Sequence, residues 1–104
     1  MPRRNLVLAA ALAAGMPLAA QAQSPDALYV RSLAATCASC HGTDGRPAPG
    51  GTLPPLAGMP REYLASQLKA FKAGTRTSTI MTQLAKGYSD AQIEQLATYF
   101  SSRK

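Results

Sequence analysis

The stretch TCASCHG, from Thr36 to Gly42, contains both cysteines and the only histidine of a 104-residue chain. Cys37 is followed three residues later by Cys40 and four residues later by His41. On one turn of an α-helix, residues at these spacings share a face. The stretch therefore brings two thiols and one imidazole together at a single point of the chain.

The order Cys-x-x-Cys-His is typical of covalent attachment of a c-type haem. Cys37 and Cys40 can bond to the two vinyl groups on one edge of a porphyrin, while the imidazole of His41 reaches the iron. One cofactor then uses all three side chains. We therefore predict one haem c, with Cys37 and Cys40 as the thioether positions and His41 as an axial iron ligand.

Three other chemistries are weighed against haem. A thioredoxin-like redox pair needs cysteines that follow a strand in a βαβ unit, and no strand pattern is visible. A structural zinc site needs four ligands, and the sequence has no second pair of cysteines or histidines. A structural disulfide is compatible with export but leaves His41 without a role.

The amino-terminal residues have the three-part order of a secretory signal peptide. Two arginines lie within Met1–Arg4, an apolar run covers Leu6–Ala14, and Ala20-Gln21-Ala22 has the small-x-small form of a cleavage site. The run is too short to span a membrane. Because the arginines lie only at the extreme end and no polar face interrupts the run, we expect cleavage rather than an uncleaved amphipathic anchor. We predict a signal peptide at residues 1–22 and a monohaem domain at residues 23–104, located in the periplasm.

The charge of the remaining chain is modest. Removal of residues 1–22 takes away Arg3 and Arg4, which lowers the formal net charge from +6 to +4. The other basic side chains are spread out without interleaved aromatic residues, so nucleic-acid binding is not expected, although an acidic partner protein would be attracted. No stretch of residues 23–104 is long and apolar enough to cross a bilayer. A domain of 82 residues has a small core and often needs a cofactor, metal or disulfide for its stability.

Apolar residues recur at helical spacing, and start and stop signals divide them into about four helices. The expected segments run from Ser24-Pro25-Asp26 towards Cys37, from about Pro60 to Ala73, from about Ser78 to Lys86, and from the capping box Ser89–Gln92 to Phe100. Residues 42–58 contain too many glycines and prolines for a helix or strand, and so long a loop in a small domain is expected to wrap around something. The fold class is therefore all-α. Helical spacing places Tyr63 and Tyr99 in the core and leaves the role of Tyr88 open.

The iron needs a sixth ligand or an open position. Without a second histidine, the soft candidate is a methionine, and only Met59 and Met81 follow the signal peptide. Met59 stands 18 residues after His41, whereas Met81 stands 40 residues after it and beyond a complete helix. That length allows Met81 to reach the opposite face of the haem. We predict Met81 as the second axial ligand and interpret Met59 as a core filler or an exposed residue.

The chain resembles a small bacterial class I cytochrome c over nearly all of residues 25–100. The resemblance is carried by CASCHG, by Pro54-x-Leu56-x-Gly58, by YLASQLKAFKAGTR, by the methionine segment and by a final helix ending in ATYF. It implies helices wrapped around one covalently attached haem. It also implies that the carbonyl of Pro54 accepts a hydrogen bond from the other ring nitrogen of His41, a contact that orients the imidazole and raises its basicity. The family's distal ligand falls on Met81.

A narrower resemblance concerns STIMTQLAKGYSD, Ser78 to Asp90, which is similar to the methionine loop of the haem subunits of flavocytochrome c sulfide dehydrogenases. In those complexes a flavoprotein oxidises sulfide and passes electrons to the cytochrome. The resemblance implies a flavoprotein subunit as the redox partner. Many such subunits carry two haems, whereas the single Cys-x-x-Cys-His of this chain can hold only one.

Ligation by His41 and Met81 would close both axial positions of the iron, which suits single-electron transfer and raises the reduction potential. The first hypothesis is a cytochrome subunit that accepts electrons from a flavoprotein sulfide dehydrogenase. The second is a free-standing shuttle to a terminal oxidase. The third is a haem peroxidase or sensor, which requires Met81 to leave the iron. No carboxylate pair or nucleophile–base arrangement can be built without His41, so the chain alone is not expected to be an enzyme.

Overall fold

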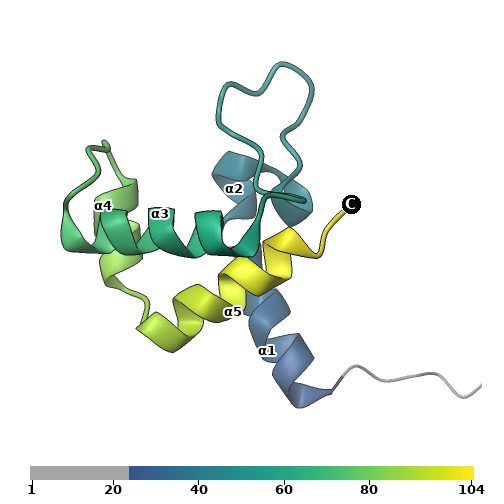
Figure 1. Cartoon of the computed structure of the whole chain (residues 1–104). Helices are drawn as coiled ribbons and strands as arrows, with labels where there is room; N and C mark the ends of the chain where they lie inside the picture. Colours follow the sequence, from purple (N-terminus) through teal and green to yellow (C-terminus); the bar gives the residue numbers. More distant parts are fainter. Residues whose placement is uncertain (1–23) are drawn as a thin grey trace, which may run out of the picture.

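A computed structural model of the protein describes residues 24–104 (Figure 1). These residues form α-helices and one 3₁₀ turn and contain no β-strand, which confirms the all-α class. The expected signal peptide at residues 1–22, and the start of the domain at residue 23, lie outside the described residues. The elements are α1 (Pro25–Ala35), α2 (Ala38–His41), η1 (Thr43–Gly45), α3 (Arg61–Ala73), α4 (Met81–Lys86) and α5 (Asp90–Ser101).

Three of the expected helix boundaries are confirmed with the side-chain contacts that cause them. At the start of α1, the hydroxyl of Ser24 accepts a hydrogen bond from the backbone amide of Ala27. At the start of α5, Ser89 and Gln92 form both hydrogen bonds of the capping box. At the end of α3, Gly74 adopts the left-handed conformation, with φ of 76°.

The expected start of the third helical segment at Ser78 is wrong by three residues, because α4 begins at Met81. The hydroxyl of Ser78 accepts a hydrogen bond from the backbone amide of Thr82 at 2.9 Å, so Ser78 caps the helix from outside its first turn. Serine favours such local side-chain bonds over continuation of the helix. Met81 is therefore the first residue of α4 and not an interior one.

The first segment also differs from expectation near the cysteines. The helix ends at Ala35, and His41 belongs to the separate short helix α2. Thr36 donates its hydroxyl proton to the carbonyl of Leu33, a local bond that competes with continuation of α1. In the region expected to be wholly irregular, Thr43–Gly45 forms the 3₁₀ turn η1.

Helix α5 occupies the centre of the fold, with α3 beside it and α1 crossing it, while α4 packs against α3 (Figure 1). The core lies where these helices meet, and it is small. Ile93 and Leu96, both on α5, are the only large side chains among the described residues that are fully buried. The remaining buried core residues come from α1, α3 and α5 and are Ala34, Leu64, Ala65, Ala97, Tyr99 and Phe100.

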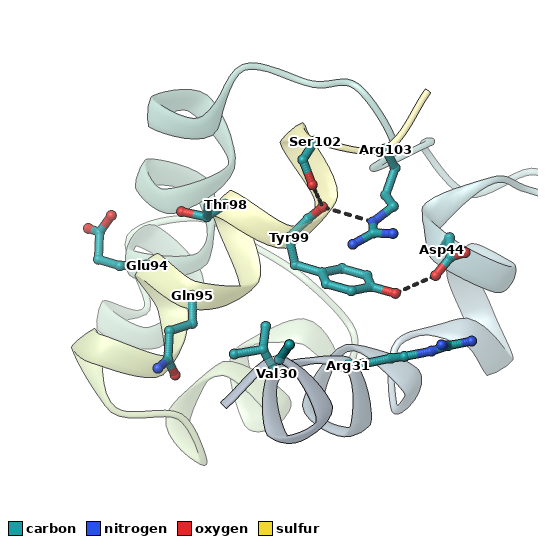
Figure 2. Close-up of a pocket in the computed structure, with 10 residues that line it drawn as sticks. Val30, Arg31, Asp44, Glu94, Gln95, Thr98, Tyr99, Ser102 and Arg103 are labelled. Atoms are coloured by element: carbon teal, nitrogen blue, oxygen red, sulfur yellow. Dashed lines mark hydrogen bonds between the residues drawn. The ribbon is translucent and has the colours of Figure 1, made fainter. Parts of the chain in front are cut away.

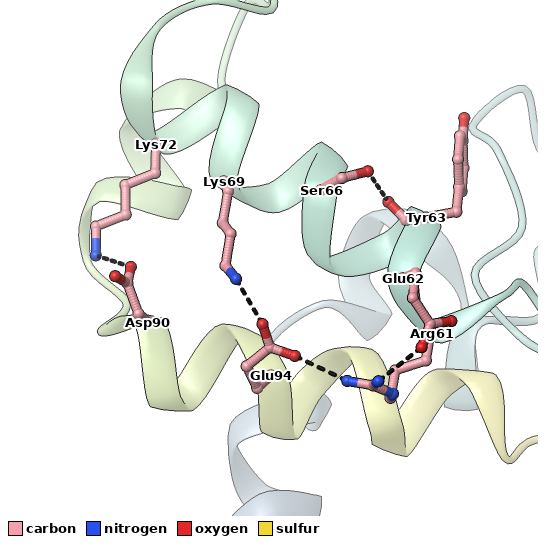
Figure 3. Close-up of polar contacts among 8 residues, drawn as sticks. All are labelled: Arg61, Glu62, Tyr63, Ser66, Lys69, Lys72, Asp90 and Glu94. Atoms are coloured by element: carbon pink, nitrogen blue, oxygen red, sulfur yellow. Dashed lines mark hydrogen bonds and ion pairs between the residues drawn. The ribbon is translucent and has the colours of Figure 1, made fainter.

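Two tyrosines that the sequence placed in the core have different positions. Tyr99 is buried, and its hydroxyl donates a hydrogen bond to the carboxylate of Asp44 (Figure 2). This hydrogen bond links η1 to α5. The prediction for Tyr63 is wrong, since its side chain is 46% exposed and points away from α5 (Figure 3). Its position on α3 satisfies the helical spacing, but no described helix covers that part of α3.

Ion pairs connect the outer sides of α3 and α5 (Figure 3). Glu94 accepts hydrogen bonds from Lys69 at 2.5 Å and from Arg61 at 3.1 Å, and Lys72 contacts Asp90 at 3.1 Å. The hydrogen bond with Lys69 lowers the pKa of Glu94 and raises the pKa of Lys69. Because these groups remain exposed to water, the pairs contribute little to stability, and their main effect is to favour one alignment of α3 beside α5.

Leu96→Ala tests the position of the core. Removal of this fully buried side chain leaves a cavity, and we expect it to lower the free energy of unfolding by about 2–5 kcal/mol. Leu28→Ala is the matched control, because Leu28 is 50% exposed and its loss is expected to cost less than about 1 kcal/mol. Chemical denaturation of the purified proteins measures both values. Equal losses in the two variants would contradict this description of the core.

Candidate functional site

The two cysteines and the histidine lie on one turn of helix. Cys37 immediately precedes α2, and the backbone amide of His41 donates to the carbonyl of Cys37 at 2.9 Å. Side chains at positions 37, 40 and 41 therefore share one face. Both thiols are free in the structure, with that of Cys37 half-buried and that of Cys40 exposed.

Gly42 makes a sharp exit from this helical turn. Its φ of 83° lies in the region that favours glycine, and a Cβ atom at this position would overlap the carbonyl oxygen of Arg46. The chain can therefore turn away directly after His41 only because residue 42 has no side chain. Sequence reasoning gave this glycine no role.

The ring of His41 is held by the loop that follows. Its Nδ1 lies 2.9 Å from the carbonyl oxygen of Pro54, the contact that the family resemblance implies. A carbonyl can only accept, so Nδ1 carries the proton and, in the neutral ring, Nε2 keeps the lone pair. Bonds further along the loop support this arrangement. The carbonyl of Gly45 accepts the amides of Leu56 and Ala57, and the amide of Gly58 donates to Phe100.

The chemistry of the described residues disfavours the three alternatives to haem. Burial raises the pKa of the Cys37 thiol, and the cysteines follow the helix α1 and not a strand, unlike those of a thioredoxin-like pair. No group of three or more His, Cys, Asp or Glu side chains within residues 24–104 is arranged to hold a metal ion, as a zinc site requires. A disulfide between Cys37 and Cys40 would leave His41, which the Pro54 carbonyl holds in place, without a role.

The two methionines have different surroundings. Met59 is partly buried and packs against the core, in agreement with the interpretation of it as a core filler. Met81 is also partly buried but does not belong to the side chains that pack against the core. The structure brings His41 and Pro54 together and leaves Met81 on a separate element, since α2 and α4 lie towards opposite ends of α3 (Figure 1).

The residues at this site suit a haem. Two neighbouring thiols and an imidazole with its lone pair on Nε2 supply the sulfur and nitrogen donors that a c-type haem uses. Large apolar side chains are about half exposed on several of the described segments, and a flat apolar macrocycle would cover surface of this kind. They are Leu53 in the loop, Tyr63 on α3, Ile80 before α4 and Leu84 on α4, together with Leu28 and Tyr29 on α1.

A hollow lies on the surface between α1 and α5 (Figure 2). Its volume is about 480 Å³, and none of the candidate haem residues lines it. Two contacts lie within it: Tyr99 donates to Asp44 at 2.5 Å, and the guanidinium of Arg103 lies over the Tyr99 ring at 3.9 Å. No cysteine, histidine or methionine lines this hollow, so it offers no donor set comparable to the one on α2.

One contact beside the cysteines has no counterpart in the sequence predictions. The hydroxyl of Tyr88 lies 3.0 Å from the hydroxyl of Thr36, across 52 residues of sequence. Thr36 immediately precedes Cys37, and Tyr88 follows the end of α4. The position of Thr36 next to the cysteine was the one available signal, and it does not identify a partner.

The chain is similar to known cytochromes over most of its length. The family model described as cytochrome c matches residues 30–104. The thiosulfate dehydrogenase electron acceptor of Thiomonas intermedia is 38% identical over an alignment 107 positions long, which covers 100% of this chain and 46% of that protein. The cytochrome subunit of sulfide dehydrogenase of Chlorobaculum tepidum is 43% identical over 70 residues, which cover 67% of this chain and 62% of that protein.

A solved structure has the same fold. The cytochrome c4 of Acidithiobacillus ferrooxidans superposes with a TM-score of 0.66 at 36% sequence identity, covering 75% of this chain and 50% of that chain. The chain thus spans between about half and three fifths of the length of these relatives.

Tyr99→Phe tests the contact between η1 and α5 through its pH dependence. The Tyr99 hydrogen bond, opposed by burial and assisted by Arg103, Arg46 and Arg31, lowers the pKa of Asp44. A lowered pKa in the folded state stabilises the protein above the ordinary aspartate pKa of about 3.9, and this stabilisation disappears as the pH falls through the folded value. We therefore expect Tyr99→Phe to reduce stability at neutral pH and to differ less from the parent in acid.

Tyr29→Phe is the matched control for this measurement. The hydroxyl of Tyr29 accepts a hydrogen bond from the uncharged amide of Gln92 at 2.7 Å, so its contribution has no reason to change with the charge of an aspartate. Denaturation of the three proteins at neutral and acid pH gives the comparison. A Tyr99→Phe deficit that is the same at both pH values would contradict the role of Asp44.

Proposed function

This chain belongs to the cytochrome c family, and we propose that it is a periplasmic electron-transfer protein carrying one haem c with histidine and methionine ligands. Electron transfer and a covalent haem c follow from the family. The proposal for the individual residues rests on one observation above the others: Cys37, Cys40 and His41 share one helical turn, and the Pro54 carbonyl holds the ring of His41.

In this proposal, Cys37 and Cys40 form the thioethers, and the Nε2 atom of His41 and the sulfur of Met81 are the axial ligands. The bound haem supplies an iron that changes oxidation state by one electron. The carbonyl of Pro54 accepts the Nδ1 proton, which makes the imidazole a stronger ligand and fixes its plane. Met81, as an iron ligand, would leave no free position for oxygen or peroxide, which favours electron transfer over peroxidase chemistry.

The exposure of the two cysteines indicates where an electron would enter or leave the protein. Cys40 is exposed and Cys37 is half-buried. Their attachment edge would lie at the protein surface, where a partner protein can approach it. Leu53, Ile80 and Leu84 would exclude water from the remainder of the ring.

No helix among the described residues is long and apolar enough to span a membrane.

The electron donor that we propose is a sulfide-oxidising flavoprotein. This rests on the similarity of the segment Ser78 to Asp90 to sulfide dehydrogenase cytochromes and on the relative from Chlorobaculum tepidum. A thiosulfate dehydrogenase is the second candidate, favoured by the relative from Thiomonas intermedia, whose similarity covers the whole chain. Both candidates place the protein after the oxidation of a reduced sulfur compound.

Met81→Ala tests the axial ligand. The thioethers do not depend on this residue, so the variant should keep the mass of one covalently bound haem. Its reduction potential should fall, because a methionine ligand raises the potential, and its ferric form should bind imidazole or cyanide readily. Potentiometry, mass spectrometry and ligand titration measure the three properties.

Met59→Ala is the matched control for the ligand. Met59 packs against the core, so its loss should reduce stability while leaving the potential and the near-infrared sulfur-to-iron band unchanged. Loss of that band in Met59→Ala, with the band retained in Met81→Ala, would transfer the ligand role to Met59. Rapid binding of carbon monoxide by the parent protein would instead support a sensor or peroxidase.

Reduction by the two candidate donors tests the partner. We expect sulfide to reduce the haem rapidly only when a sulfide-oxidising flavoprotein from the same cells is added, and we expect the two proteins to purify together. Absorbance during rapid mixing measures the rate. Rapid reduction by thiosulfate and its dehydrogenase would favour the second candidate. A monomer that neither system reduces would favour a free shuttle to a terminal oxidase.

A further inference from the structure

The hydrogen bond between Thr36 and Tyr88 connects two segments that the proposed function gives separate roles. Thr36 is directly bonded to Cys37, and the two hydroxyl oxygens lie 3.0 Å apart. Tyr88 is partly buried and packs against the core, as does Cys37. Packing therefore holds the Tyr88 side of the contact, while the exposed Thr36 side chain is oriented by its own hydrogen bond to the carbonyl of Leu33.

The direction of the hydrogen bond is determined by a second contact. Thr36 donates its one hydroxyl proton to the carbonyl of Leu33 at 2.8 Å. Its oxygen can then only accept from Tyr88, so the phenol of Tyr88 is the donor. Thr36→Ser can preserve this geometry, whereas Thr36→Val and Tyr88→Phe each remove it with little change of shape. Thr36→Val also removes the hydrogen bond to the Leu33 carbonyl, so Tyr88→Phe is the variant that removes this contact alone.

Tyr88 is closely tied to the helix that begins with Met81. Its backbone amide donates to the carbonyl of Ala85 at 3.2 Å, and the amide of Gly87 donates to that of Leu84 at 3.0 Å. Ala85 is fully buried. Movement of α4 as a unit would therefore move Tyr88 and break its contact with Thr36.

No other hydrogen bond within residues 24–104 joins the stretch 36–41 to the stretch 78–88. The Ser78–Thr82 bonds are local to the second stretch, and the His41–Pro54 bond leads to the loop. The Thr36–Tyr88 bond is thus the direct polar connection between the segment with the cysteines and the segment with Met81.

We propose that Tyr88 is a positioning residue that keeps Met81 on the iron by tying α4 to the attachment segment through Thr36. This inference rests on the proposed function, because it takes Met81 as the ligand. Release of Met81 by movement of α4 costs this hydrogen bond in the parent protein. Removal of the phenol hydroxyl lowers that cost and makes the sixth position easier to occupy from solution.

The test measures imidazole binding to the ferric, haem-loaded protein. Imidazole competes with Met81 for the iron, so we expect Tyr88→Phe to bind it about threefold more tightly than the parent, as expected for the loss of one exposed hydrogen bond. The near-infrared sulfur-to-iron band should also disappear at a lower temperature. Thr36→Val should give the same change, Thr36→Ser should restore the parent value, and the double variant Thr36→Val/Tyr88→Phe should show no further increase.

Tyr29→Phe separates positioning from general stability. This variant also loses one hydrogen bond of a tyrosine hydroxyl, the one accepted from Gln92 at 2.7 Å. That bond joins α1 to α5 and does not involve α4. We expect it to lower the unfolding midpoint as Tyr88→Phe does and to leave imidazole affinity unchanged. An equal rise in affinity in both tyrosine variants would overturn the inference, because the effect would then be a general loosening of the fold.

The inference and the proposed function fail in different ways. If the parent has the sulfur-to-iron band, Met81→Ala loses it and Tyr88→Phe binds imidazole like the parent, the role of Tyr88 is overturned and the ligand assignment stands. If the parent lacks the band, or if Met81→Ala keeps it, the ligand assignment is overturned and the inference with it.

Discussion

The hydrogen bond between His41 and the carbonyl of Pro54 is the interaction on which the arrangement of the site depends. It determines which ring nitrogen carries the proton, and it connects a short helix to a loop that is otherwise poor in regular structure. The bonds of Gly45 to Leu56 and Ala57 keep the base of that loop in place. A side-chain orientation in α2 is thus maintained by a backbone group 13 residues away.

The small core explains why contacts outside it matter. Ile93 and Leu96 are the only large side chains fully buried among the described residues, and α5 carries both. Helix α5 is consequently the element against which α1 and α3 are placed. The segments that carry the cysteines and Met81 lie at the margin of this core, where individual hydrogen bonds, such as those of Tyr99 and Tyr88, have to fix positions that packing alone does not.

Much of the fold could be predicted because its helices carry local signals. The Ser89–Gln92 capping box and Gly74 each determine a boundary through contacts within a few residues. The prediction failed for the start of α4, since no local pattern distinguishes a serine that caps a helix from outside it. It also failed for Tyr63, since helical spacing does not show whether another helix covers that face. The Cys-x-x-Cys-His motif indicated the site, but the Thr36–Tyr88 contact joins positions 52 residues apart, and spacing cannot reveal it.

Gly42 and Gly50 have nearly the same φ but differ in the space around them. Both have φ close to 80°, but a Cβ atom at Gly42 would overlap the carbonyl oxygen of Arg46, whereas one at Gly50 would meet nothing within 4 Å. Grafted peptides or tethers to an electrode therefore meet no steric obstacle near Gly50, provided that Gly50 itself is kept, because its φ of 82° would strain any residue with a side chain. Libraries that randomise the motif should keep residue 42 fixed.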